Sequence, residues 1–287
     1  MSNIVSGVDF DVSKDYMYTK AKINANGRKS IGILNSQTKK SLHMSTPLML
    51  TWGVNTYTDE KTGATTYDLA LQFPIDEYNS PETTSFLKNM QALEQKIKDD
   101  AVANSKDWLN KNKLVPEAVD ALWSPMLKYP KDKETGESDY SRPPTLKVKI
   151  PYWEGEFKNV ELYDVDHNQL YPPLDDSDVT IAQLITKGSN IATIIQCGGI
   201  WVANGKFGVT WKLFQSLVKP RESLKGKCHI SLSADEKAKI ASVASDADDA
   251  DDADTDDVAH AETPHASTVV EDSDEEEAVV RTPEPTV

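Results

Sequence analysis

The sequence is short of the features on which secreted and membrane proteins depend. It has only two cysteines, Cys197 and Cys228, among 287 residues, too few for the disulfide framework of a small secreted protein. The first ten residues show neither the basic nor the apolar stretch of a secretory signal. No apolar run approaches the about 20 residues that a membrane helix needs. We therefore expect a soluble, intracellular protein with no membrane partner.

Motifs for metal, cofactor and catalytic chemistry are also missing. The run Asp175–Asp178 lacks the glycine and the terminal glutamate of a calcium loop. There is no glycine-rich phosphate loop, no GxSxG motif and no Cys/His arrangement with local support. None of the histidines has metal-ligand spacing: His43, His167, His229, His260 and His265. We expect no cofactor, no metal and no enzymatic activity, although scattered carboxylates leave an enzyme of unrecognised type as an alternative.

The negative charge is confined to one end of the chain. The formal net charge is −15, from 46 acidic and 31 basic residues. The last 42 residues contain 16 of the acids and a single base, Arg281, so residues 1–245 are neutral. This acidic segment also has too little apolar side-chain area to offset the entropy of folding. The composition predicts a folded domain over 1–240 and a disordered acidic tail over 241–287.

Most of the expected folded domain has the alternating pattern of β-strands. Apolar residues recur at every second position in 47–54, 65–74 and 145–150, which predicts strands with one buried and one exposed face. In the third of these, Lys147 and Lys149 share the exposed face. Further strands are expected near 30–35, 157–163 and 189–218, and CHISL at 228–232 is a candidate last strand.

Helical spacing interrupts this pattern at about 80–123. Ser80 and Pro81 form a typical helix start, and apolar residues follow at steps of four, three and four: Phe86, Met90, Leu93 and Ile97. Two shorter helices are expected at 105–112 and 116–123. Antiparallel strands with one helical insertion predict a mainly β fold, an OB-fold-like small barrel or a sandwich.

The segment 194–214 is a predicted hairpin, because Asn204-Gly205 favours a two-residue type I′ turn. This register places Trp201 opposite Gly208 and Trp211 opposite Gly198. Gly198-Gly199 would suit a sharp bend in the strand. A three-residue loop would change the register by one residue.

The same register divides the hairpin into two faces. The expected core face is mostly apolar and contains Ile194, Gln196, Ile200, Val202, Phe207, Val209, Trp211, Leu213, Gln215 and Leu217. The opposite face mixes aromatic and basic residues: Cys197, Trp201, Lys206, Thr210, Lys212 and Phe214. Aromatic rings that stack bases, beside lysines that neutralise phosphates, are typical of single-stranded nucleic-acid binding. Alternatively, Trp201 and Phe214 pack under the helical insertion.

A loop before the strand at 145–150 adds further basic and aromatic residues. Lys128, Tyr129 and Arg142 belong to this loop and would extend the Lys147/Lys149 face into the second wall of a basic groove. The alternative is an ordinary solvated loop.

Four segments resemble a protein family of nucleocytoplasmic large DNA viruses. They are QCGGIWVANGKFGVTWKLFQ at 196–215, NSKDWL at 104–109, PMLKYPKDKETGE at 125–137 and PTLKVKIPYW at 144–153. That family is distantly similar to the single-stranded DNA-binding protein of short-tailed phages, and the resemblance covers roughly residues 40–232. It implies an OB-fold barrel that coats single-stranded DNA during replication. It also implies a tail that contacts the DNA polymerase and other replication proteins, although the phage relatives end in an aromatic residue and this chain ends in Val287.

The favoured hypothesis is a sequence-independent single-stranded DNA-binding protein of viral replication and recombination, located at the replication site in the cytoplasm or nucleus of the infected cell. Its partners would be single-stranded DNA, replication proteins and further copies of itself. The partner-binding acids of the tail would be Asp248, Asp249, Asp251, Asp252, Asp274, Glu275, Glu276 and Glu277. The alternative is a structural or virion-associated protein whose acidic tail binds basic partners.

Overall fold

The structure is a computed structural model that describes residues 4–24, 27–174, 178–219 and 230–245. The chain divides into two compact units, 1–223 and 224–287. Within the described part of the second unit lies one helix, α5 (Ala234–Ser245), which crosses the boundary expected at residue 240. None of the helices in the described ranges has both the length and the apolar character needed to span a membrane.

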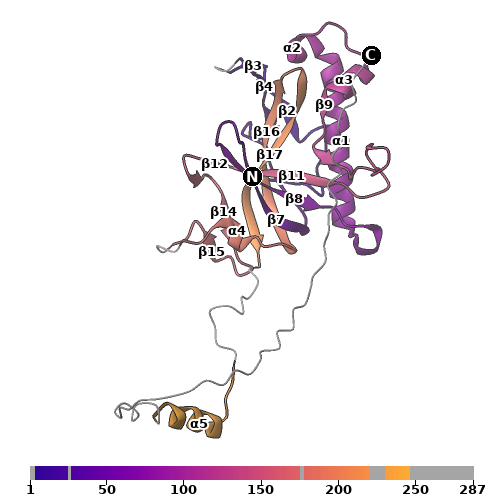
Figure 1. Cartoon of the computed structure of the whole chain (residues 1–287). Coiled ribbons are helices and arrows are strands. Elements are labelled where there is room, and N and C mark those ends of the chain that lie inside the picture. The colour runs from indigo at the N-terminus through magenta and orange to yellow at the C-terminus, as the bar shows by residue number, and fades with distance from the viewer. Residues whose placement is uncertain (1–3, 25–26, 175–177, 220–229, 246–287) are drawn as a thin grey trace, which may run out of the picture. The chain divides into compact units, whose positions relative to one another are not determined.

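Five strands of the first unit close into a barrel (Figure 1). In chain order they are β7 (Met49–Thr58), β8 (Thr65–Gln72), β11 (Thr145–Ile150), β16 (Ser189–Ala203) and β17 (Lys206–Val218). Around the ring, β7 pairs with β8, β8 with β11, β11 with β17, β17 with β16, and β16 with β7. The β11–β17 pair is parallel and the other four are antiparallel. A closed five-stranded barrel with a chain crossover is the architecture of the OB-fold, so the predicted fold class is confirmed.

Shorter strands extend the barrel sheet or form small ribbons beside it. β1 (Ile4–Ser6), β6 (His43–Ser45), β3 (Lys22–Ile23) and β4 (Lys29–Ile31) join the sheet on the β16 side. β9 (Trp123–Ser124), β14 (Glu161–Tyr163) and β15 (Gln169–Tyr171) join it on the β17 side, and β10 (Leu127–Lys128) pairs with β11. β2 (Tyr16–Tyr18) pairs with β5 (Ile33–Asn35), and β12 (Tyr152–Trp153) pairs with β13 (Glu156–Phe157).

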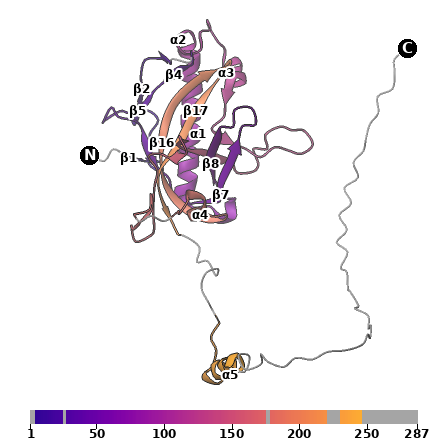
Figure 2. The ribbon, with the colours of Figure 1, turned by 60° about the vertical axis from the view of Figure 1, so that its left-hand side comes forward.

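The predicted hairpin is the β16–β17 pair, whose two long strands bend along their length (Figure 2). Asn204 and Gly205 have φ angles of 51° and 70°, as a type I′ turn requires. Trp201 is paired with Gly208, as the sequence predicts. The bend predicted at Gly198-Gly199 is present as a bulge between Cys197 and Ile200.

This bulge makes part of the predicted register wrong. Trp211 pairs with Cys197, not with Gly198, because the bulge places extra residues on one strand only. Cys197 is therefore buried, although the uninterrupted register placed it on the outer face. A second irregularity between Ile194 and Ile195 changes the phase again and leaves Leu217 37% exposed instead of in the core. Five of the predicted core residues are buried, namely Ile200, Phe207, Val209, Trp211 and Leu213, whereas Ile194, Gln196, Val202 and Gln215 are only partly buried.

The helical insertion is also confirmed. It consists of α1 (Pro81–Ala103), α2 (Ser105–Leu109) and α3 (Pro116–Leu122), preceded by a short 3-10 helix, η1 (Asp76–Tyr78), while α4 (Ile181–Leu184) lies before β16. Ser80 caps α1 by accepting a hydrogen bond from the Thr83 amide. The four residues of the predicted helical stripe are all fully buried. Figure 1 shows α1 lying along one side of the strands, with α2 and α3 at its C-terminal end.

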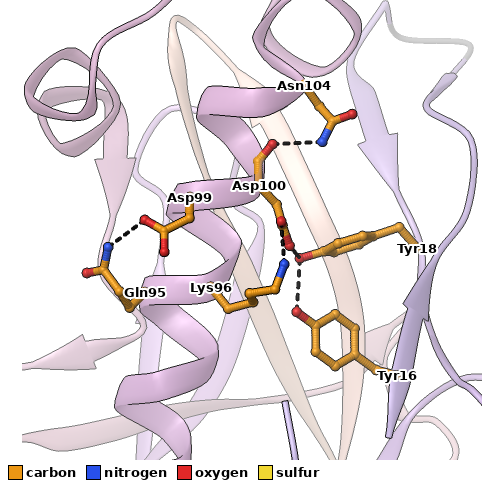
Figure 3. A network of polar contacts seen from close by, with 7 residues as sticks. All are labelled: Tyr16, Tyr18, Gln95, Lys96, Asp99, Asp100 and Asn104. Atoms are coloured by element: carbon orange, nitrogen blue, oxygen red, sulfur yellow. Dashed lines mark hydrogen bonds and ion pairs between the residues drawn. The ribbon is translucent and has the colours of Figure 1, made fainter. Parts of the chain in front are cut away.

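A polar network ties α1 to β2 (Figure 3). The Tyr18 hydroxyl donates to the Asp100 carboxylate over 2.9 Å and lies 3.1 Å from the Tyr16 hydroxyl. Lys96 pairs with the other carboxylate oxygen of Asp100. Burial raises the pKa of Tyr18, so this phenol stays protonated and able to donate. The network therefore fixes the orientation of the insertion against a strand that lies far from it in the sequence.

Two sequence predictions fall at the end of the chain. The candidate strand at 228–232 is not present in its described part, because residues 230–232 form no strand. The predicted tail acids from Asp248 to Glu277 lie outside the described residues.

Candidate nucleic-acid interface

The outer face of β11 carries two exposed lysines. Leu146, Val148 and Ile150 point into the barrel and are buried, while Lys147 and Lys149 point outward. This alternation is the one the sequence predicts. β11 lies between β8 and β17 in the middle of the barrel sheet, so the positions of the two lysines are fixed by pairing on both sides.

Lys128 joins these lysines from a different part of the chain. In β10 it pairs with Thr145 at the start of β11, and it lines the same pocket as Lys147 and Lys149. Burial lowers the pKa of Lys128; the negative charge of Glu94 raises it, and the positive charge of Lys147 lowers it. A partly desolvated ammonium beside another ammonium favours an incoming anion.

Trp201 forms a wall between two adjoining pockets. The first pocket, of about 180 Å³, is lined by Trp201 with Lys128, Lys147 and Lys149. The second, of about 360 Å³, shares Trp201 and Lys149 and adds Arg28 and Lys29. We call the two pockets together the Trp201 groove. The indole is partly exposed, so a flat ligand can reach it.

A glycine on the facing strand sets the position of this indole. A Cβ atom at Gly208 would lie 3.0 Å from Cζ2 of Trp201 and 2.9 Å from the carbonyl oxygen of Ser124. Such contacts are too close, so the site needs glycine at this position. The indole packs over the glycine and thereby keeps one orientation in the groove.

Asp68 partly balances the positive charge of the Trp201 groove. Its carboxylate lies 2.7 Å from the Lys147 ammonium and accepts a hydrogen bond from the Asn55 side chain over 3.2 Å. The Lys147 side chain nevertheless stays 52% exposed. Asp68 belongs to β8, where it pairs with Lys149. Asp68, and Glu94 near Lys128, are therefore outnumbered by the basic residues that line the groove, and the groove keeps its positive character.

Lys212 and Phe214 continue the outer face of β17. Lys212 pairs with Lys149 in the parallel β11–β17 ladder and is exposed, so the two like charges repel each other in the absence of an anion. Phe214 is partly buried and packs edge-on against His43, with ring centroids 4.7 Å apart. It lines neither pocket of the Trp201 groove. This contact is with His43 of β6, whereas the alternative prediction placed Phe214 under the helical insertion.

Two basic residues near the groove make bonds that support the helical insertion. The Lys206 ammonium donates to the Ala121 carbonyl at the end of α3 over 2.7 Å. The Lys29 ammonium donates to the Asp107 carbonyl at the end of α2 over 2.6 Å. Basic side chains at helix C-termini donate hydrogen bonds to carbonyl groups that have no partner within the helix. Lys206, a predicted site residue, therefore has a structural partner and lies outside both pockets of the groove.

Tyr129 and Arg142 belong to a separate pocket. Both line a hollow of about 250 Å³ together with Tyr140. Tyr129 packs against Tyr140 at 4.7 Å between ring centroids, and its hydroxyl accepts a hydrogen bond from Gln91. The predicted second wall is therefore divided, because of Lys128, Tyr129 and Arg142 only Lys128 lines the Trp201 groove.

Arg28 and Lys29 of the second pocket were missed by sequence reasoning. They reach the groove because β4 pairs with β16 beside Trp201. That pairing joins residues about 170 positions apart, and no local pattern indicates it.

The described residues offer little for metal or thiol chemistry. No group of three or more His, Cys, Asp or Glu side chains among them is arranged to hold a metal ion. Burial raises the pKa of the Cys197 thiol to about 12, so this thiol stays protonated and unreactive at neutral pH.

Comparison with known proteins gives distant structural neighbours and one family. The single-stranded DNA-binding protein from bacteriophage Enc34, solved in complex with ssDNA, is 14% identical with a TM-score of 0.38, over 73% of this chain and 98% of that chain. Gp2.5, the single-stranded DNA-binding protein of bacteriophage T7, is 13% identical with a TM-score of 0.38, over 66% and 98%. Such distant likeness carries no argument about what this chain binds. No curated protein sequence matches. Residues 10–257 match the family described as "Protein of unknown function (DUF2738)", and the chain belongs to that family.

Proposed function

We propose that this chain binds single-stranded DNA without regard to sequence and acts in viral DNA replication and recombination. The observation that carries the proposal is the Trp201 groove, in which one accessible indole is bordered by Lys128, Lys147 and Lys149. Arg28 extends the basic border on the other side of the indole. The groove lies on the outer side of the barrel, over β11, β16 and β17.

The mechanism combines stacking with phosphate neutralisation. A base that stacks on Trp201 gains about 1–3 kcal/mol, and every base offers a face for this contact. The lysines are placed to contact phosphates, and such contacts position a strand without reading its sequence. Binding releases counterions and therefore weakens as salt increases. No catalytic step is part of this function.

The acidic tail is proposed as the regulatory and partner-docking segment. The last 42 residues of the chain account for the whole net charge of −15. This negative charge is opposite in sign to the positive charge of the groove. A tethered polyanion has a high effective concentration near the groove, so it would compete with DNA at low salt. We propose that the same acids dock replication proteins such as the DNA polymerase, at the replication site inside the infected cell.

The test is a titration of a fluorescent single-stranded oligonucleotide with the full chain, at several salt concentrations, beside the same oligonucleotide as a duplex. We expect salt-dependent binding that prefers the single strand. Trp201→Ala should weaken that binding by about 1–3 kcal/mol with little change in the melting temperature.

Trp153→Ala is the matched control, because Trp153 is exposed but lines neither pocket of the Trp201 groove. This variant should bind as the parent does. Equal weakening by both substitutions, or no binding of single strands by the parent protein, would reject the proposed function.

A further inference from the structure

A second and larger cleft, of about 730 Å³, lies near the start of β11. Two exposed aromatic side chains line it: Trp52 of β7, which is 55% exposed, and Tyr78 of η1, which is 72% exposed. Leu48 and Ile75 are also exposed in its walls. A concentration of exposed apolar side chains in one hollow marks an interaction site. We call it the Trp52 cleft.

Trp52 lies at a bulge in β7, on the opposite face of the strand from the buried Thr51. The ladder with β8 is interrupted between Thr51 and Val54. Gly53 has a φ of +91°, and a Cβ atom there would lie 3.2 Å from the Lys187 amide nitrogen. Such a position favours glycine. The exposure of Trp52 is therefore built into the strand and is not a matter of a free rotamer.

The Trp52 cleft repeats the chemistry of the Trp201 groove. The Lys187 ammonium lies 5.7 Å from the centre of the Trp52 ring, within the range of a cation–π contact. Arg142 lines the cleft, and of the described residues that line it, none is acidic. Aromatic rings with cations and no opposing carboxylate suit an anionic ligand that has flat rings.

The two sites lie along the same strand, β11. Thr145 lines the Trp52 cleft and pairs with Lys128, which lines the Trp201 groove. Lys147 and Lys149 follow Thr145 at every second position on the outer side of the same strand. At about 3.3 Å per residue, the Cα atoms of Thr145 and Lys149 are about 13 Å apart. A row of basic residues thus joins two tryptophans.

We propose that the Trp52 cleft is a second base-stacking subsite for the strand that occupies the Trp201 groove. The inference rests on the proposed function. The sugar-phosphate backbone follows the lysines of β11, one base stacks on Trp201, and a base several nucleotides away stacks between Trp52 and Tyr78. The rival occupant, an apolar protein segment, would not need the basic row.

Oligonucleotide length separates the two subsites. OB-fold proteins occupy about 4–16 nucleotides, so labelled oligo-dT of about 4 and about 16 nucleotides should fill one subsite and both subsites, respectively. Trp52→Ala and Tyr78→Ala should each weaken binding of the longer strand by about 5-fold or more. Both variants should bind the shorter strand as the parent does. Trp201→Ala should weaken binding of both lengths, and Trp153→Ala of neither.

The outcomes distinguish failure of the inference from failure of the function. If Trp201→Ala weakens binding while Trp52→Ala and Tyr78→Ala leave both lengths unaffected, the second subsite is wrong and the function stands. If Trp201→Ala also has no effect, the proposed function fails with it. Tyr78→Ala guards against loss of folding, because Tyr78 is 72% exposed and its removal leaves the buried core intact.

Discussion

Two tryptophans on neighbouring strands of the barrel show how local geometry assigns one residue type to different tasks. Trp211 of β17 is 1% exposed, and its indole N–H points to the Met126 sulfur over 3.4 Å. Trp201 of β16 points the other way, packs over Gly208 and stays accessible in a groove of lysines. The difference comes from the side of the sheet on which each residue lies. From this difference we expect Trp211 to contribute to stability, and we propose that Trp201 contributes to binding.

The largest effect that would sharpen this comparison is the loss of Trp211. Trp211→Ala should lower the free energy of unfolding by about 3–5 kcal/mol, because it leaves a cavity in a packed core. Chemical denaturation measures this loss. Trp201→Ala should cost far less stability, and the opposite ranking would show that the two roles are exchanged.

The next effect concerns the glycine under Trp201. Gly208→Ala should displace the indole and the Ser124 carbonyl, at a cost of about 1–3 kcal/mol in stability. DNA binding should weaken in the same variant, since the stacking surface moves. Tryptophan fluorescence, denaturation and DNA titration on one sample would report all three changes. Unchanged DNA affinity with a shifted indole would argue against stacking on Trp201.

A smaller effect separates the lysines of the groove from a lysine that caps a helix. Lys147→Gln with Lys149→Gln should reduce the slope of log affinity against log salt by about 1.4, at about 0.7 for each phosphate that is no longer neutralised. The control is Lys206→Gln, because the Lys206 ammonium donates to the Ala121 carbonyl. If Lys206→Gln reduces the slope as much as the double substitution does, Lys206 contacts DNA phosphates and the assignment is wrong.

The smallest effect is a dependence on pH. Burial lowers the pKa of Lys128 below the usual 10.5, so Lys128 loses its positive charge at a lower pH than exposed lysines do. Affinity for single-stranded DNA should therefore begin to fall as pH rises toward 10.5. In the Lys128→Arg variant this affinity should fall less over the same pH range, because a guanidinium stays charged. Titrations at neutral and alkaline pH measure the difference, and parallel curves for the two proteins would exclude Lys128 from the contact.

Local patterns in the sequence are enough to predict the five strands of the barrel and the three helices of the insertion, but not short elements such as β9, β10, β15 and α4. The Asn204-Gly205 turn, the stripe from Phe86 to Ile97 and the alternation around Lys147 each depend on residues close in the chain. The bulge at Gly198-Gly199 was predicted as a bend, but its effect on the register of Trp211 was not. A bulge changes every later pairing, and a sequence pattern does not give the number of residues that it inserts.

The candidate site could be predicted only in part, because it is assembled from distant segments. Trp201, Lys147 and Lys149 were found from strand periodicity, and the structure brings them together with Lys128. Arg28 depends on the pairing of β4 with β16, which leaves no local signal. For Trp52, periodicity predicts a strand with two faces, but which face is exposed depends on how β7 pairs with β8 and β16 in the barrel.

The most direct test of the account is to identify which residues touch the DNA. Single-stranded DNA that contains bromodeoxyuridine can be cross-linked by ultraviolet light to the full chain, and the cross-linked peptides can be identified by mass spectrometry. The account predicts cross-links at Trp201 that disappear when unlabelled single-stranded DNA or high salt is added. Cross-links at Trp153 or elsewhere on the barrel, with none at Trp201, would contradict it.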